Sequence, residues 1–130
     1  MAEILVLKLM DYPGCVPDDD YAQRPANGWK PGLPDEDIIE LNRWCWDVGV
    51  KRGAACSHVL FWHTGKVRAI AEITGIYGPY EQHRDGRILS KKAIEVNPLG
   101  PGDEAYERWY DQPVPQIDDG KRSVVRYFTP

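Results

Sequence analysis

Cysteine and long apolar runs are both scarce in this sequence. The apolar stretch at residues 4–7 meets Lys8 at once, has no basic region before it, and is far too short to span a bilayer. We therefore expect no membrane partner and no targeting signal. The three cysteines, Cys15, Cys45 and Cys56, form neither an even disulfide set nor a CxxC pair. A reducing compartment is the simplest interpretation, so we assign the chain to the cytoplasm by default.

Motifs that mark common enzyme and metal sites are missing as well. The sequence has no phosphate-cradling glycine loop, nucleophile elbow or HExxH motif. Cys56, His58 and His63 are zinc-ligand types, but on a strand the first two share one face and His63 falls on the other. The aspartates at 18–20 lack the alternating ligands and glycine of an EF-hand loop, which favours a solvated loop. The sequence predicts no metal and no cofactor, and it favours a protein that is not an enzyme.

The composition is that of one folded domain with many turns. The chain has 130 residues, of which 42% are hydrophobic and 28% charged, and it contains 12 glycines and 11 prolines. We predict a single domain over residues 1–130. The net charge of −4 argues against a wholly basic nucleic-acid coat protein. Basic charge is nevertheless concentrated in residues 48–92, which carry eight basic and three acidic side chains.

Hydrophobic spacing predicts a small set of short elements. Residues 3–10 alternate as a central strand covered on both faces would, and the proline-rich residues 11–34 predict a long ordered loop over the body. The spacing of Ile38, Leu41, Cys45 and Val48 predicts one helix from residue 35 to Gly49. Further along the chain the sequence predicts a hairpin at 59–62 and 67–76, a turn-rich stretch at 77–86, a strand at 87–96, a helix at 103–110 and a strand at 123–128. This order predicts an α+β fold with a strongly bent mixed sheet or partly open β-barrel and two or so peripheral helices.

Residues 60–77, LFWHTGKVRAIAEITGIY, resemble the PUA-like superfamily, especially EVE and YTH-type domains and less closely ASCH domains. Residues 60–64 match the first strand motif of EVE-like chains and residues 69–73 match the second. Two features depart from the family pattern. The usual Gly-Asp pair is replaced by residues 53–56, and the pocket segment Trp-x-Gly-Val-Arg-Asn has no clean counterpart around Trp29.

The resemblance implies a PUA-like domain that binds RNA or DNA and recognises one modified or extruded base in an aromatic pocket. Such a pocket needs stacking aromatic rings, a few polar groups and nearby cations. The candidate ligand-binding residues are Trp44, Trp46, Trp62, His63, Lys51, Arg52, Arg68 and Tyr77. We expect them to meet between the helix, the Trp62 hairpin and the long loop. The predicted function is non-catalytic binding of nucleic acid or a nucleobase-like small molecule.

Other interpretations of the same residues stay open. Each tryptophan is more often a packing residue than a ligand contact, and the basic segment also fits an ordinary solvated face. Exposed tryptophans would equally suit a homodimer surface with no ligand, and thus a protein-interaction module. Some ASCH-like proteins are small amidohydrolases, and Glu72, Thr64 and Lys66 would be the residue types for such an activity.

Overall fold

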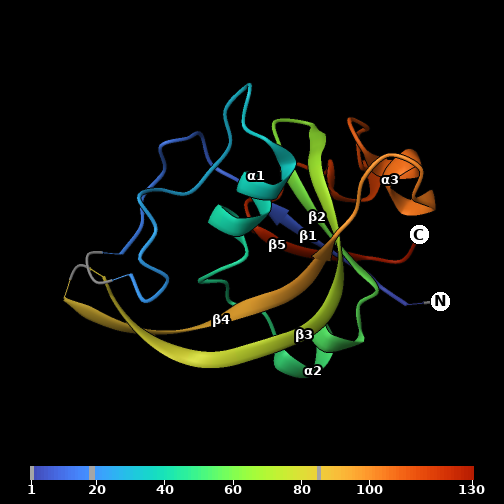
Figure 1. Ribbon diagram of the computed structural model, residues 1–130. Coiled ribbons are helices and arrows are strands. Elements are labelled where there is room, and N and C mark those ends of the chain that lie inside the picture. The colour runs from blue at the N-terminus through green and yellow to red at the C-terminus, as the bar shows by residue number, and fades with distance from the viewer. Residues whose placement is uncertain (1, 18–19, 85) are drawn as a thin grey trace.

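A strongly curled five-stranded sheet forms the body of the protein (Figure 1). The computed structural model describes residues 2–17, 20–84 and 86–130. The strands are β1 (Ile4–Lys8), β2 (His58–His63), β3 (Lys66–Arg84), β4 (Arg87–Pro98) and β5 (Val125–Phe128), in the order β4-β3-β2-β1-β5. Only β1 and β2 pair in parallel among these strands; the other neighbours are antiparallel. The prediction of an α+β fold with a bent mixed sheet is confirmed, and the curl is compatible with a partly open barrel.

Helices and loops cover both faces of the sheet. Helices α1 (Asp35–Asn42) and α2 (Val50–Ala55) lie on one face with the long N-terminal loop, while α3 (Glu104–Trp109) and the 3-10 turn Pro115–Ile117 lie on the other (Figure 1). Strand β1 shows the division most clearly. Leu5 and Leu7 pack in one cluster with Ile38 and Ile39 of α1, whereas Ile4 and Val6 pack with Trp109 of α3. The prediction of a strand covered on both faces is therefore confirmed.

The segment predicted to be rich in turns is part of a long strand. Strand β3 runs on to Arg84 and pairs with β4 as far as Arg84 and Arg87. The register shifts between Tyr77 and Tyr80, where Gly78 has a φ of 116° and an added Cβ would lie 3.1 Å from the Lys91 carbonyl oxygen. The glycine and proline that suggested a turn are thus accommodated in a bulge. Bulges bend a strand and increase its twist, and here they let the hairpin curl away from the sheet.

The predicted helix from residue 35 to Gly49 is too long. Helix α1 ends at Asn42, and a second helix, α2, carries the two cations expected to follow the first helix, Lys51 and Arg52. The side chain of Asn42 explains the early end. Its amide nitrogen donates to the carbonyls of Gly28 and Ile38, and its oxygen accepts from the Gly28 N–H. The helix is therefore tied to the long loop at the point where the helical spacing would continue.

Candidate functional site

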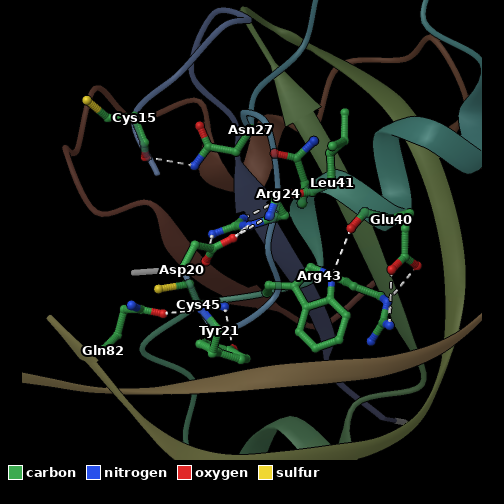
Figure 2. Close-up of polar contacts among 12 residues, drawn as sticks. Cys15, Asp20, Tyr21, Arg24, Asn27, Glu40, Leu41, Arg43, Cys45 and Gln82 are labelled. Carbon is green, nitrogen blue, oxygen red and sulfur yellow. Dashed lines mark hydrogen bonds and ion pairs between the residues drawn. The ribbon is translucent and has the colours of Figure 1, made fainter. Parts of the chain in front are cut away.

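The last carbonyl groups of α1 accept hydrogen bonds from side chains instead of from further helical turns. An α-helix leaves its last four carbonyls without helical partners. Here the indole N–H of Trp44 donates to the Glu40 carbonyl at 2.8 Å, and that of Trp46 donates to the Asn42 carbonyl. The Arg24 guanidinium donates to the Leu41 carbonyl at 2.9 Å (Figure 2). Both indole N–H groups are therefore used inside the protein, and the tryptophan rings present carbon surface.

A cavity of about 360 Å³ lies beside these two tryptophans. It is located near the carboxyl end of β1, where the long loop, residues 42–47, strand β4 and the start of β5 meet. The lining residues come from these four parts of the chain and from the end of β1 with the two residues after it: Lys8, Leu9, Met10, Cys15, Pro17, Arg24, Asn27, Asn42, Trp44, Cys45, Trp46, Asp47, Leu89, Lys91, Val124 and Val125. The lining is mainly apolar, and its charged residues are Lys8, Arg24, Asp47 and Lys91.

Arg24 holds the loop wall of the cavity in place. Its guanidinium donates to both carboxylate oxygens of Asp20, at 2.9 and 3.1 Å, and both side chains are 4% exposed. The backbone N–H of Arg24 donates to the same carboxylate at 2.9 Å. The prediction that the aspartates at 18–20 form a solvated loop is therefore wrong for Asp20, while positions 18 and 19 lie outside the described residues. Burial is tolerated because the two opposite charges satisfy each other.

Tyr21 joins the long loop to residues 42–47 and to strand β3. Its N–H donates to Gln82 on β3 at 2.9 Å, and its hydroxyl accepts from the N–H of Cys45 at 3.1 Å (Figure 2). Its ring stacks on Tyr80 at 4.7 Å and meets Trp44 edge-on at 5.7 Å. Burial raises the pKa of Tyr21 above its ordinary value, so its hydroxyl is neutral at physiological pH. The sequence marked Tyr21 only as a large side chain in the loop, because its partners lie far away in the chain.

The charged residues of the cavity give it a partly cationic rim. Lys91 approaches from β4 and is half-buried. Lys8 of β1 also lines the cavity, but its ammonium donates to the Lys121 carbonyl at 3.1 Å and lies over the Trp62 ring. The charge of Arg24 is balanced by Asp20, as described above. Asp47 is exposed and lies 3.9 Å from the ammonium of Lys92. The rim therefore offers the ammonium of Lys91 as a donor and the carboxylate of Asp47 as an acceptor around an apolar interior.

His63 and Arg68 lie outside the cavity, in a cluster of side chains that packs around Trp29. The His63 ring is buried, contacts the Trp29 ring at 4.8 Å and lies 2.6 Å from the Asp11 carboxylate through Nε2. The Arg68 guanidinium covers the Trp29 ring at 4.1 Å and donates through Nε to the His63 carbonyl at 3.3 Å. A bulge makes this possible, since Trp62 pairs with Val67 and Phe61 with Ala69, so that Arg68 is the extra residue. Neither His63 nor Arg68 lines the cavity.

The remaining predicted residues are dispersed. Trp62 packs on the α3 face of the sheet, away from Trp44 and Trp46. Arg52 forms a bidentate ion pair with Glu3 at 2.9 Å, which holds the pKa of Glu3 below its ordinary value. Lys51 on α2 and Tyr77 on β3 are exposed. Trp44 and Trp46 line the cavity, and the other six predicted residues do not.

The cysteine and histidine residues of zinc-ligand type are bonded to other groups. Burial raises the pKa of Cys56 to about 11, and its thiol donates to the Arg52 carbonyl, while His58 bonds to Ser57. Among the residues described, His, Cys, Asp and Glu side chains form no group of three that fits a metal ion. Glu72, one of the residue types for an amidohydrolase, is exposed on β3 and does not line the cavity.

Comparison with protein-family models, with curated proteins and with solved structures finds no match to this chain. In the part of the chain that the structure covers, every helix is too short or too polar to cross a lipid bilayer.

Proposed function

We propose that the cavity beside Trp44 and Trp46 binds a flat, nucleobase-like ring without catalysing a reaction. The observation that carries the proposal is the meeting of two indoles, an apolar interior and a partly charged rim in one space of about 360 Å³. Small-molecule sites have volumes of about 300–1,000 Å³ and combine apolar walls with a few polar groups. The volume and lining of this cavity agree with that description.

The rim chemistry favours a nucleobase over a plain aromatic ring. A base presents both hydrogen-bond donors and acceptors along its edge. Asp47 supplies a carboxylate that accepts, while Lys91 supplies an ammonium group that donates. The indole N–H groups are already bonded, so Trp44 and Trp46 contribute through the faces and edges of their rings. A ring with polar atoms on its edge and carbon on its faces fits these groups best.

We also propose that the fold is PUA-like. Residues 60–77, which carry the resemblance, form the β2–β3 hairpin and the first half of β3. The β2–β3 turn is made by Thr64 and Gly65, both with positive φ, as a two-residue hairpin turn requires. Strand β2 of this hairpin is next to β1 at the centre of the curled mixed sheet. The resemblance and the sheet shape therefore support the same assignment, and base recognition follows from it.

Titration of the intrinsic tryptophan fluorescence with the four ribonucleosides tests the proposal. Binding quenches the emission of Trp44 and Trp46, and Trp44→Ala weakens the tightest nucleoside by about 5- to 150-fold, which corresponds to the about 1–3 kcal/mol of one stacked base. The control is Trp62→Phe, which alters the opposite face and leaves the affinity unchanged. No quenching by any nucleoside at millimolar concentration refutes the proposal, as does an unchanged affinity in a folded Trp44→Ala protein.

A further inference from the structure

The ammonium group of Lys91 is unpaired within the part of the cavity wall that the structure describes. Lys91 comes from β4, is half-buried and lines the cavity. Among the described residues, its ammonium forms no ion pair and no side-chain hydrogen bond. A charge that loses part of its water without gaining a partner costs free energy. Lys91 therefore has unused capacity for an anion, at a position that a molecule in the cavity can reach.

The other charged residues that line the cavity leave its surroundings positive. Arg24 forms its ion pair with the buried Asp20. Asp47, which is the carboxylate among the described lining residues, faces the ammonium of Lys92 at 3.9 Å. The ammonium of Lys8 donates to a backbone carbonyl at 3.1 Å, which does not neutralise its charge. The two opposite pairs cancel, so the charge that remains around the cavity favours an anion over a cation.

The end of α1 indicates that this anion carries a single charge. The helix meets the cavity at its carboxyl end, where helices have a partial negative charge that opposes a doubly charged phosphate. Bonds from Trp44, Trp46 and Arg24 to its last carbonyls reduce this effect. Phosphate sites commonly use a helix N-terminus or a bidentate arginine, but Arg24 is already bound to Asp20. A carboxylate needs only the ammonium of one lysine.

We infer that the ligand of the cavity is a small heteroaromatic acid, with its ring beside Trp44 and Trp46 and its carboxylate on Lys91. The inference rests on the proposed function and deepens it by naming the charge and the chemical class of the ligand. The ring is the nucleobase-like ring of that proposal, and its N–H groups donate to Asp47. The volume of about 360 Å³ suits one ring with one carboxylate. The ligand thus supplies the partner that Lys91 lacks.

Isothermal titration calorimetry with orotate and with its uncharged amide measures the contribution of the charge. The two probes share one pyrimidine ring and nearly the same shape, and they differ in the group that meets Lys91. We expect orotate to bind about 10- to 150-fold more tightly, which is the range of a hydrogen bond between charged groups. The comparison uses the unmodified protein, so it does not depend on the folding of a variant.

The variant Lys91→Met assigns the effect to this side chain. Methionine keeps an unbranched apolar stem and removes the charge, so the affinity for orotate falls to that for the amide, which is itself unchanged. The matched control is Arg87→Met, which removes an exposed charge from the same strand outside the cavity. Arg87 lies about 13 Å farther along β4, beyond the screening length at about 150 mM salt, so the preference for orotate is retained. Circular dichroism verifies that both variants are folded.

The failures of the inference and of the proposed function are distinguishable. If the ribonucleosides bind but orotate binds no more tightly than its amide, the inference falls and the proposed function stands. If a folded Lys91→Met protein keeps the preference for orotate, another group holds the carboxylate and the assignment to Lys91 is overturned. If the ribonucleosides, orotate and the amide all fail to bind at millimolar concentration, both proposals fall.

Discussion

Replacing Arg24 by methionine tests whether the buried ion pair holds the cavity wall. Methionine keeps much of the side-chain volume but removes the donors to both Asp20 oxygens and to the Leu41 carbonyl. Asp20 is then left as a buried charge without its partner, since both side chains are 4% exposed. Removing one member of such a pair costs about 3–5 kcal/mol. For 130 residues, this free energy corresponds to a fall in Tm of about 11–18 °C.

The companion variant separates the ion pair from ordinary packing. Arg24→Met combined with Asp20→Asn removes both charges, so no carboxylate is left unpaired. We expect the double variant to be about 2–3 kcal/mol more stable than Arg24→Met alone. Thermal unfolding followed by circular dichroism measures both variants, with Arg108→Met on exposed α3 as the surface control. A fall in Tm of less than about 3 °C for Arg24→Met, or additive effects in the double variant, refutes the reasoning.

Three further predictions concern other parts of the fold. In Gly53→Ala, the new Cβ would lie 2.6 Å from Val48 Cγ1. We expect the overpacking cost of about 1–3 kcal/mol to exceed the gain in helix propensity of about 1 kcal/mol, so that the variant is less stable. A higher Tm of the variant in thermal unfolding contradicts this. Arg126 holds the pKa of Asp119 well below its usual range, so Asp119→Asn should be destabilising at pH 7, and this difference should begin to shrink as the pH falls below about 4, where the unfolded chain takes up a proton that the native carboxylate does not; a difference at pH 2 as large as that at pH 7 contradicts this. Cys56 should react with a thiol reagent only after unfolding, because its pKa is raised to about 11 and it is buried; rapid labelling of the native protein in mass spectrometry is the contrary result.

Local patterns predicted the elements that local interactions stabilise. Alternation identified β1, and the Thr64–Gly65 turn identified the β2–β3 hairpin. The helix expected at 103–110 forms as α3, and Asp103 caps it by accepting from the N–H groups of Ala105 and Tyr106. In each case the residues that decide the structure are near one another in the sequence. Such signals are available without knowledge of the fold.

Long-range contacts determine the elements whose bounds were wrongly predicted from the sequence. The helical spacing continues to Val48, but Asn42 bonds to Gly28 and Trp46 forms a bridge with Lys92. These partners are 14 and 46 residues away, and nothing near residue 42 indicates them. Tertiary contacts of this kind override local propensity. The same limit applies to the Gly78–Pro79 bulge, which has the local signature of a turn.

The candidate site was only partly predictable for the same reason. Trp44 and Trp46 were singled out as candidate ligand-binding residues, and both line the cavity. Trp62 was expected beside them, but its position on β2 directs it to the α3 face. Tyr21 and Lys91 were missed because their importance comes from partners on other elements. Residue type indicated which side chains suit a ring ligand, whereas only the fold shows which of them meet.

The position of β1 has a consequence for how the protein folds. Leu5 pairs on one side with Val59 and on the other with Tyr127, more than 100 residues away in the chain. A ladder of this kind forms only after a long loop has closed, and proteins dominated by such distant pairings fold slowly. Until residues 125–128 have been synthesised, one edge of the most apolar strand remains open to pairing with other chains. During synthesis, this edge is therefore where aggregation would begin.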